Sequence, residues 1–501
     1  MKVGFISLGC SKNLVDSEKI MGMLQANGHT LVHSPSEAEA IIINTCGFIT
    51  SAKEEAISTI FEMARYKEHG LKKLIAVGCL AQRYKEQLEE EIPELDAVVR
   101  ISDYDHLHEV LAEELHDEGK VRFADAERLL SSKPWTAYLK IAEGCSNHCT
   151  YCAIPLIRGD NVSVPMERLV EEARGLAKRG VKELVLNAQD TTKYGVDLYG
   201  SRKLLELLQR LHEIDGFHWI RILYMYPDEI DDELIEGMAK LPKVLPYFDI
   251  PMQHANDEML VRMNRRGTKE EVLRLIEKIR DTFASPTLRT TFIVGFPGED
   301  RQTMDELLQF VRDVRWDHMG AFTYSPEEDT PGFSMKPVCP DEVKERYLDE
   351  LMKLQEQIAL CEQTIAYFEQ LESQVELAAV PDAMEIREEL VKRGYMNAQK
   401  SGIRRRKGKQ IPHFTVFDIE GTLVYLGKNN IQNEYLTRTL ARKDDLWFHT
   451  KDLHGSHVIC TDPQPDERLL RICAMLAAYY SQGRFSSSVP VNYCPVRQLK
   501  K

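Results

Sequence analysis

Three cysteines of this sequence form a Cys-x3-Cys-x2-Cys pattern, at Cys145, Cys149 and Cys152. Thiolates are soft ligands that suit iron–sulfur clusters and zinc. A loop this tight can hold three irons of one cluster and leave the fourth iron open, and an open coordination position is typical of a catalytic metal site. A zinc ion would need a fourth ligand, which His148 could supply. The spacing therefore predicts a metal centre and favours an iron–sulfur cluster over zinc.

Three further cysteines lie far apart in the sequence but occupy similar local positions. Cys10, Cys46 and Cys79 each follow a short apolar run, and each has a glycine beside it that lets the backbone approach a neighbour closely. If the three runs are parallel strands, their carboxyl ends lie on one edge of a sheet, where ligands bind. Separate buried thiols are the alternative interpretation. Because the same placement occurs three times, we favour a second, shared metal site.

The first 125 residues contain the elements that would bring these thiols together. Apolar runs alternate there with amphipathic stretches, at residues 3–8, 14–26, 40–44, 52–66, 73–77 and 81–91. This alternation is the signature of a parallel sheet with crossover helices. The sequence therefore predicts an N-terminal parallel α/β domain over residues 1–125.

Length and composition limit the class of protein. The chain has 501 residues, of which 43% are hydrophobic and 29% charged, and no uncharged apolar run is long enough for a membrane span. These values exclude a disordered or fibrous protein and fit about three domains. The apolar start at residues 1–8 is too short for a secretory signal, so we expect a cytoplasmic protein. An odd count of 11 cysteines in that compartment favours metal or redox chemistry over disulfides.

The cysteines from Cys145 to Cys152 resemble the signature of the radical S-adenosylmethionine (SAM) family. The resemblance implies that the three thiolates hold a 4Fe-4S cluster, on whose open iron SAM is bound and cleaved to a 5′-deoxyadenosyl radical. It also implies a partial (β/α) barrel over residues 133–337. Apolar runs that fit the strands of such a barrel lie at residues 184–186, 219–223, 247–250, 290–294 and 319–323.

Catalytic loops of such barrels follow the carboxyl ends of the strands. One loop resembles the cofactor-contacting loop of the radical SAM family, and its residues are Gly295, Phe296, Pro297, Gly298 and Glu299. Gln189 ends another strand and is expected to line the same cavity. His254 ends a third strand, although an isolated histidine is more often a structural hydrogen-bonding residue.

Two cysteine triads in this order resemble the methylthiotransferases, radical SAM enzymes that insert sulfur at an unactivated C–H bond and methylate it. The resemblance covers about residues 1–357. It implies a second 4Fe-4S cluster, on Cys10, Cys46 and Cys79, that presents the sulfur. It also implies two SAM molecules per turnover and an electron donor such as flavodoxin or ferredoxin.

Two segments point to one branch of that family. Residues 9–18 (GCSKNLVDSE) and 154–159 (IPLIRG) resemble the branch that modifies the β-carbon of an aspartate in a small-subunit ribosomal protein. The branch that modifies tRNA typically carries Gln-Met-Asn after the first cysteine, and it remains the alternative. One position departs from the first branch, because Val164 stands where an arginine is usual.

The last part of the sequence resembles a different family. Residues 366–501 look like the C-terminal RNA-binding module of the NFACT ribosome quality-control proteins, and not like the small β-barrel (TRAM) domain that ends methylthiotransferases. The resemblance is clearest at residues 386–390, 427–430 and 441–452, and it implies contact with RNA or the ribosome. The residues expected to make this contact, with a merely solvated surface as the alternative, are Arg404, Arg405, Arg406, Lys407, Lys409, Lys443, Trp447 and His449.

Aromatic and imidazole side chains alternate in one strand-turn-strand pattern of this region, at Trp447, His449, His454 and His457. A catalytic or metal cluster is one interpretation. The alternation favours buried hydrogen-bonding residues instead, within a small α+β domain expected at residues 385–501. That module would normally continue beyond Lys501.

A helical segment at residues 341–380 joins the two regions that resemble these families. Its 4-3 apolar spacing predicts either a coiled-coil seam or an ordinary amphipathic helix on the body. The seam residues are Tyr347, Leu351, Leu354, Ile358, Cys361, Ile365 and Phe368. Pro381 is expected to end the helix. The chain is then either an inherited fusion or the product of two genes joined near residues 355–365.

Three functions are consistent with the sequence. The first is methylthiolation of an aspartate in a small-subunit ribosomal protein. The second is methylthiolation of tRNA. The third is a catalytically inert fusion protein that binds RNA or the ribosome through its C-terminal domain. No membrane partner is expected for any of them.

Overall fold

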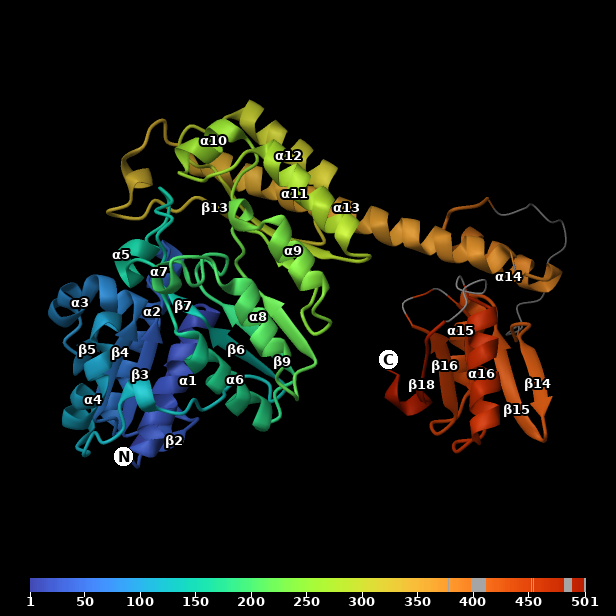
Figure 1. Ribbon diagram of the computed structural model, residues 1–501, viewed down its shortest axis with the longest axis horizontal. Helices are drawn as coiled ribbons and strands as arrows, with labels where there is room; N and C mark the ends of the chain where they lie inside the picture. The colour runs from blue at the N-terminus through green and yellow to red at the C-terminus, as the bar shows by residue number, and fades with distance from the viewer. Residues whose placement is uncertain (377, 398–410, 452, 454, 482–488, 500–501) are drawn as a thin grey trace. The chain divides into compact units, whose positions relative to one another are not determined.

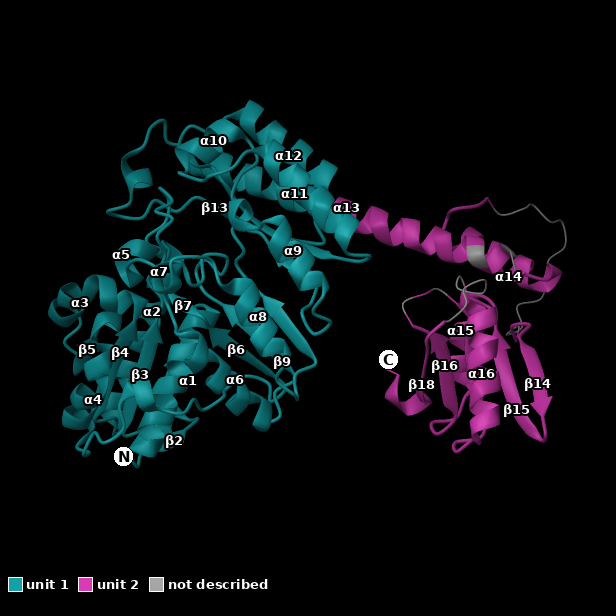
Figure 2. Ribbon diagram, viewed as in Figure 1, with its two compact units in different colours: residues 1–356 teal, residues 357–501 magenta. Residues whose placement is uncertain are grey.

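The computed structural model describes residues 1–376, 378–397, 411–451, 453, 455–481 and 489–499. These residues fall into two compact units, residues 1–356 and residues 357–501, shown in different colours in Figure 2. The long helix α13 (Asp341–Glu376) runs through the boundary between the units. Each unit has its own sheet structure and its own hydrophobic core.

The first unit begins with a parallel sheet of five strands in the order β2-β1-β3-β4-β5. Strand bounds are Lys2–Ser7 (β1), Thr30–Val32 (β2), Ala40–Thr45 (β3), Lys73–Gly78 (β4) and Ala97–Val99 (β5). Neighbouring residues of β3 point to opposite faces, so that Ile42 packs with helices α1 (Ser11–Ala26) and α4 (Leu107–Leu115). Ile43 packs on the other face with α2 (Thr50–Ala64) and α3 (Cys79–Glu91). This three-layer arrangement is the predicted parallel α/β fold, coloured blue in Figure 1.

Two three-stranded parallel sheets follow and form the partial barrel. One has the order β10-β9-β6 and the other β11-β12-β13. Strand bounds are Thr136–Lys140 (β6), Glu183–Asn187 (β9), Trp219–Ile222 (β10), Tyr247–Asp249 (β11), Thr287–Val294 (β12) and His318–Thr323 (β13). Backbone hydrogen bonds from Ile220 N to Lys243 O, at 2.7 Å, and from Leu245 N to Ile220 O, at 2.9 Å, link the two sheets.

Amphipathic helices alternate with the strands of the partial barrel. Their bounds are Met166–Lys178 (α6), Leu204–His212 (α8), Asp232–Ala239 (α9), Lys269–Thr282 (α11) and Arg301–Val314 (α12). Shorter helices are Ile154–Arg158 (α5), Val196–Tyr199 (α7) and Asp257–Arg262 (α10). A short antiparallel pair, β7 (Ala142–Glu143) and β8 (Val162–Ser163), closes a loop directly after β6. That loop carries the Cys-x3-Cys-x2-Cys pattern.

The predicted seam of α13 is buried only in its first half. Tyr347, Leu351 and Leu354 are buried, and Gln355 donates a hydrogen bond to the carbonyl of Trp316 at 3.1 Å. Ile365, in contrast, is 55% exposed. The first half is therefore an ordinary amphipathic helix on the body, which was the alternative to a coiled coil.

The expectation that Pro381 ends this helix is wrong. Helix α13 ends at Glu376, and α14 (Val380–Lys392) has Pro381 in its first turn. The first turn of a helix tolerates proline because the missing backbone N–H has no partner there in any case.

The second unit contains an antiparallel sheet in the order β14-β15-β17-β16-β18. Strand bounds are Thr415–Ile419 (β14), Thr422–Gly427 (β15), Leu446–Thr450 (β16), His457–Cys460 (β17) and Val491–Pro495 (β18). Helix α16 (Glu467–Tyr479) packs its Cys473 against the sheet, and α15 (Asn430–Tyr435) follows β15. Within the described part of the chain, no helix combines the length and the apolar character needed to cross a bilayer.

Candidate functional site

The three distant cysteines lie at the carboxyl ends of adjacent strands. Cys10 is the N-cap residue of α1 after β1, Cys46 follows β3, and Cys79 begins α3 after β4. Gly9, with φ +89°, packs so tightly that an added Cβ would lie 3.1 Å from the sulfur of Cys46. The Cys79 thiol donates a hydrogen bond to Asn13 Oδ1 at 3.4 Å. The fold thus brings the three residues to one edge of the sheet.

Burial shapes the acidity of these thiols. Burial, together with the neighbouring charges of Cys79 and Cys10, raises the pKa of Cys46 to about 11. Burial also raises the pKa of Cys79, while the guanidinium of Arg158 lowers it. Thiols in such surroundings are held as neutral groups until a metal displaces their protons.

The second triad lies in the loop between β7 and β8. This loop is closed at its base by a backbone hydrogen bond from Cys145 N to Gly159 O, at 3.0 Å. Gly144 has φ +72°, and an added Cβ would lie 2.2 Å from the carbonyl oxygen of Asp160, so the turn requires glycine. Burial raises the pKa of both Cys145 and Cys152.

Side chains from the barrel strands hold this loop in place. Asn147 donates to Asp190 Oδ2 at 2.7 Å, and Asp190 lies just after β9. The sulfur of Cys149 lies 3.7 Å from Tyr226 Oη and 4.0 Å from a guanidinium nitrogen of Arg265. The Arg265 guanidinium in turn lies 3.8 Å from the Tyr226 ring centroid. One face of the cysteine loop is therefore covered by an aromatic ring and a buried cation.

The geometry of the second triad does not favour zinc. His148 is exposed and its Nε2 faces Asp160 at 3.3 Å. Among the described residues, no three His, Cys, Asp or Glu side chains are close enough to hold a single metal ion. Ligands of one tetrahedral zinc lie about 4 Å apart. A 4Fe-4S cluster spreads its thiolates over different irons and needs wider spacing.

A buried charge network joins the two parts of the first unit. Arg158, on α5, donates to Glu143 at 2.6 Å, to Asp16 at 3.2 Å and to the sulfur of Cys79 at 3.5 Å. Lys140 pairs with Asp16 and, at 2.6 Å, with Glu143. Burial alone would raise the pKa of Glu143, but the charges of Lys140 and Arg158 outweigh it and hold that pKa at about 2. Arg158 thus connects the loop of the second triad to a cysteine of the first.

The start of α1 lies against the carboxyl ends of the barrel strands. Asn187, the last residue of β9, donates to Ser11 Oγ at 2.9 Å. The Nζ of Lys12 lies 3.2 Å from the centroid of the Tyr224 ring, just beyond β10. Burial lowers the pKa of Lys12 to about 8, and the charge of Cys10 opposes that shift. The first triad is therefore presented at the mouth of the barrel.

The predicted cofactor loop is held mainly by its own contacts. Glu299 accepts hydrogen bonds from the backbone N–H groups of Gly295 and Phe296, and the ring of Phe296 is fully buried. Pro297 accepts a hydrogen bond from Arg262 Nε at 3.0 Å, and an added Cβ at Gly298 would lie 2.7 Å from the same Nε.

Some buried polar atoms near the barrel mouth have no hydrogen-bond partner. They include Gln189 Oε1, His254 Nε2 and Glu299 Oε1. The last two face each other at 3.5 Å, and His254 Nδ1 accepts from the backbone of Asn256 at 3.0 Å. Gln189 also donates to Glu143 at 3.4 Å. The partners of His254 agree with a structural histidine, and Gln189 stays a candidate for contact with a ligand.

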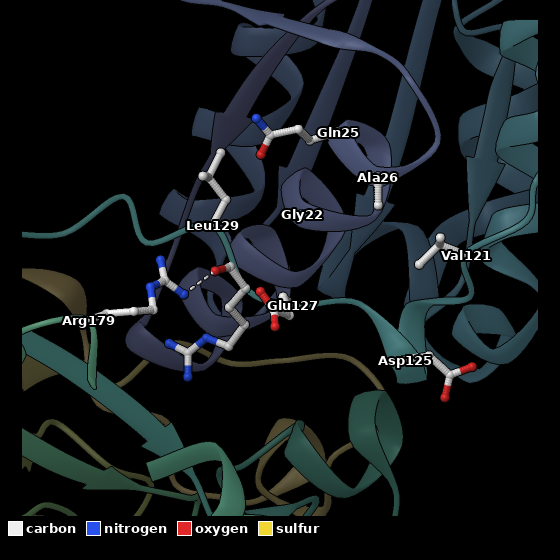
Figure 3. Close-up of a pocket in the computed structure, with 9 residues that line it drawn as sticks. Gly22, Gln25, Ala26, Val121, Asp125, Glu127, Leu129 and Arg179 are labelled. Carbon is white, nitrogen blue, oxygen red and sulfur yellow. Dashed lines mark hydrogen bonds between the residues drawn. The ribbon is translucent and has the colours of Figure 1, made fainter. Parts of the chain in front are cut away.

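A separate cavity of about 430 Å³ lies at the other end of α1 (Figure 3). Its wall includes Gly22, Glu127 and Arg179, and Arg179 donates to the carbonyl of Arg128 at 2.6 Å. No cysteine lines it. Fifteen residues of helix, about 20 Å, separate Gln25 in its wall from Cys10. This cavity is therefore not the cysteine site.

In the second unit, Trp447, His449 and His457 gather on β16 and β17. The Trp447 and His449 rings stack with centroids 5.6 Å apart, and His457 packs edge-on against both at 5.3 Å. His457 Nδ1 is 3.0 Å from Thr437 Oγ1. These contacts agree with the structural interpretation of the cluster.

Of the other residues predicted to bind RNA, the structure describes only Lys443. Lys443 is exposed in the loop before β16. Arg404, Arg405, Arg406, Lys407 and Lys409, like His454, lie outside the described residues.

Sequence reasoning missed several residues of the cysteine site. Tyr226 and Arg265 cover the second triad, and the ring of Tyr224 contacts the ammonium of Lys12. None of them stands at a fixed spacing from a cysteine. Arg158 and Asp16 fall inside the segments that carried the family resemblance, but the contacts of Arg158 with Asp16 and with Cys79 join residues 142 and 79 positions apart.

Comparison with known proteins supports both resemblances. Residues 2–100 match the family described as Uncharacterized protein family UPF0004, residues 139–311 match the Radical SAM superfamily, and residues 412–501 match the NFACT protein RNA binding domain. A curated relative is the ribosomal protein uS12 methylthiotransferase RimO of Lachnoclostridium phytofermentans. It is 51% identical over 384 residues, which cover 75% of this chain and 86% of the relative.

Two solved structures illustrate what the chain is similar to. The C-terminal part of the fibronectin/fibrinogen-binding protein from Streptococcus suis is 34% identical, covers 32% of this chain and 64% of that chain, and has a TM-score of 0.29. The radical SAM methyltransferase TsrM from Kitasatospora setae, with cobalamin and a 4Fe-4S cluster bound, is 13% identical. It covers 66% of this chain and 77% of that chain, with a TM-score of 0.49.

Proposed function

The chain belongs to the family of ribosomal protein uS12 methylthiotransferases, RimO, and on that premise we propose that its first unit methylthiolates an aspartate β-carbon of uS12. The observation that carries this proposal is the placement of two cysteine triads in one compact unit. One triad ends the strands of the first sheet, and the other lies in the loop after β6. Arg158, in the helix that follows Cys152, contacts Cys79, and Lys12 lies over the ring of Tyr224 at the ends of the barrel strands.

The donor sets suit the cofactors of this family, which are 4Fe-4S clusters and SAM. We assign one cluster to Cys10, Cys46 and Cys79 and the other to Cys145, Cys149 and Cys152, because each set offers three soft thiolates and no site for a single ion. SAM is assigned to the second cluster, with Gln189 and the backbone of the 295–299 loop beside it. When bound, these groups supply the hydrogen abstraction, the sulfur and the methyl group of the reaction.

The residues of this chain bind and orient the reacting groups. Asp190 fixes the cysteine loop through Asn147, at 2.7 Å. Arg158 brings a fixed positive charge to Cys79, which offsets the negative charge of a thiolate-bound cluster. Burial of Phe296 and Tyr226 excludes water from the surroundings of the second triad.

Each of the two units has its own proposed binding partner. Ribosomal protein uS12 is the proposed substrate, and the NFACT-type unit is proposed to contact RNA or the ribosome. A small electron donor such as flavodoxin or ferredoxin is proposed to reduce the second cluster, in the cytoplasm. Transfer RNA remains the alternative substrate.

Anaerobic reconstitution tests the metal assignment, and purified substrates test the reaction. Two 4Fe-4S clusters should give about 8 iron per chain. With SAM and a reductant, uS12 should gain the mass of a methylthio group on one aspartate, while purified tRNA should not. Zinc in place of iron would overturn the cluster assignment, and a methylthio group on tRNA alone would overturn the substrate.

A second candidate function is a ribosome-binding adaptor without catalysis, which the match of residues 412–501 to an RNA-binding domain favours. Deletion of residues 366–501 should abolish salt-dependent binding to ribosomes if the second unit docks there. Unchanged binding would exclude the adaptor. If the full chain both binds ribosomes and modifies uS12, the protein is an enzyme, and ribosome binding is part of its activity.

A further inference from the structure

Lys12 places an ammonium group near Cys10 of the first triad, at the carboxyl ends of the barrel strands. The residue follows Cys10 by two positions in the first turn of α1 and is only 6% exposed. Its Nζ lies 3.2 Å from the centroid of the Tyr224 ring. A cation over an aromatic face is held by the ring quadrupole, which aligns the ammonium without neutralising it.

Two neighbouring cations, Arg158 and Lys140, have carboxylate partners, whereas Lys12 has none among the described residues. Arg158 and Lys140 share Asp16 and Glu143. For Lys12, in contrast, the structure gives neither an ion pair nor a hydrogen bond with any residue that it describes. Buried charges are normally paired, because an unpaired one loses its solvation without compensation.

The nearby carboxylates are already committed to other cations. Asp249, at the end of β11, accepts from the backbone of Tyr224 at 3.0 Å and from Arg289 at 2.6 Å. Glu143 is bound by Arg158 at 2.6 Å. The ammonium of Lys12 is therefore available to an anion that enters from outside the chain.

The surroundings of Lys12 define where that anion would lie. Ser11, its neighbour, is hydrogen-bonded to Asn187 at the end of β9. Tyr224 follows β10 at the same edge, with the left-handed φ of +57° that is unusual for a tyrosine. An anion on Lys12 would thus sit at the carboxyl ends of the barrel strands, beside Cys10, which is where barrel enzymes bind their substrates.

We propose that Lys12 binds the side-chain carboxylate of the substrate aspartate and so positions its β-carbon between the two cysteine triads. This inference rests on the proposed function. In an aspartate the β-carbon is bonded directly to the carboxylate carbon, so a fixed ammonium places the reacting carbon one bond from an anchored group. Such orientation is a large source of rate enhancement.

The test compares aspartate and asparagine substrates on the reconstituted full chain. First, the modified aspartate of uS12 is located by mass spectrometry, and a uS12 variant with asparagine at that position is made. Wild-type enzyme should bind the asparagine form about 10- to 100-fold more weakly than the aspartate form, as expected for loss of a charge-assisted hydrogen bond. The measurement is the dissociation constant under anaerobic conditions.

Substitutions at Lys12 and at a matched lysine complete the design. Lys12→Met keeps the length of the side chain without its charge, and it should bind both forms of uS12 equally. Lys12→Arg keeps the charge and should restore part of the preference for aspartate. Lys19→Met is the control, because Lys19 lies two turns further along α1 over the ring of Phe123, away from the cysteines. This control should keep the wild-type preference.

Two results would overturn the inference: equal binding of both uS12 forms by the wild-type enzyme, or a preserved preference in Lys12→Met. The first of these needs no variant of the enzyme, so it stands even if Lys12→Met loses iron. Failure of the proposed function would be seen differently: the iron-loaded wild-type enzyme would leave every aspartate of uS12 unmodified.

Discussion

At the scale of single residues, two buried arginines tie the first sheet to the partial barrel, and only one of them contacts a cysteine. Arg128 bridges Glu18 on α1, at 2.7 Å, and Glu172 on α6, at 2.6 Å. Arg158 makes equivalent bonds to Asp16 and Glu143 but also donates to Cys79. Removal of one partner from a buried ion pair leaves an uncompensated charge, so both residues contribute to the stability of this unit.

The two arginines separate a structural effect from an effect on the metal site. We expect Arg158→Gln and Arg128→Gln each to lower the free energy of unfolding of the first unit by about 3–5 kcal/mol. Only Arg158→Gln should also weaken the cluster on Cys10, Cys46 and Cys79, with iron falling from about 8 toward about 4 per chain after gentle chelation. Urea denaturation and iron analysis measure the two effects.

Arg128→Gln is the matched control, since it removes a buried arginine of the same unit without touching a cysteine. If iron fell equally in both variants, loss of stability alone would explain it and the contact with Cys79 would have no separate role. If Arg158→Gln kept all its iron, Arg158 would be a structural residue only.

At the scale of elements, the sequence predicts strands well where they are apolar throughout. The run at residues 40–44 matches β3, which is buried along its whole length. For β12, the apolar run at residues 290–294 predicts only the later part of the strand. The strand begins at Thr287, where buried and half-buried residues alternate and no continuous apolar run marks it. The first cysteine triad could be expected at one sheet edge because the ends of parallel strands converge, and the second could be recognised from its spacing alone. The covering of the second triad by Arg265 and Tyr226 could not, because only the folded chain brings those residues together.

The histidine and tryptophan cluster of β16 and β17 makes the second unit sensitive to acid. Burial and the neighbouring His449 lower the pKa of His457 to about 3, against an ordinary value of 6.5. Between those two values the unfolded chain binds a proton that the folded unit does not, so stability rises with pH. We expect the second unit to lose up to about 2 kcal/mol of unfolding free energy between pH 7 and pH 5.

Fluorine NMR of 5-fluorotryptophan in the full chain can follow this loss, because Trp447 is the only tryptophan of the second unit. Urea titrations at pH 7 and pH 5 would report the unfolding of that signal, which is assigned with Trp447→Phe. His457→Gln should flatten the dependence on pH. An unchanged dependence in that variant would mean that another group takes up the proton.

At the scale of the whole molecule, one helix belongs to both units. The first half of α13 is anchored in the body through Gln355. Its last turns belong to the second unit, where Tyr367 Oη donates to Glu389 at 2.9 Å and Gln370 Nε2 to Asn430 Oδ1 at 2.6 Å. Between these anchors Leu360 and Ile365 are 64% and 55% exposed. The middle of the helix therefore depends mainly on its own backbone hydrogen bonds. In isolation, a helical segment as short as this one is only marginally stable.

This middle segment allows the two units to be separated without disturbing either core. A protease site that replaces residues 358–364 should permit cleavage of the reconstituted chain, with the iron remaining on the N-terminal fragment. Because both anchors survive the cut, turnover of free uS12 should change by less than about twofold. Turnover of uS12 within ribosomal subunits should fall at low substrate concentration, because a tethered RNA-binding unit raises the effective concentration of the catalytic unit near its target. The control is a chain with the same replacement that is left uncut. An equal loss of turnover on both substrates would show that the second unit supports the catalytic unit directly and does not deliver it to the ribosome.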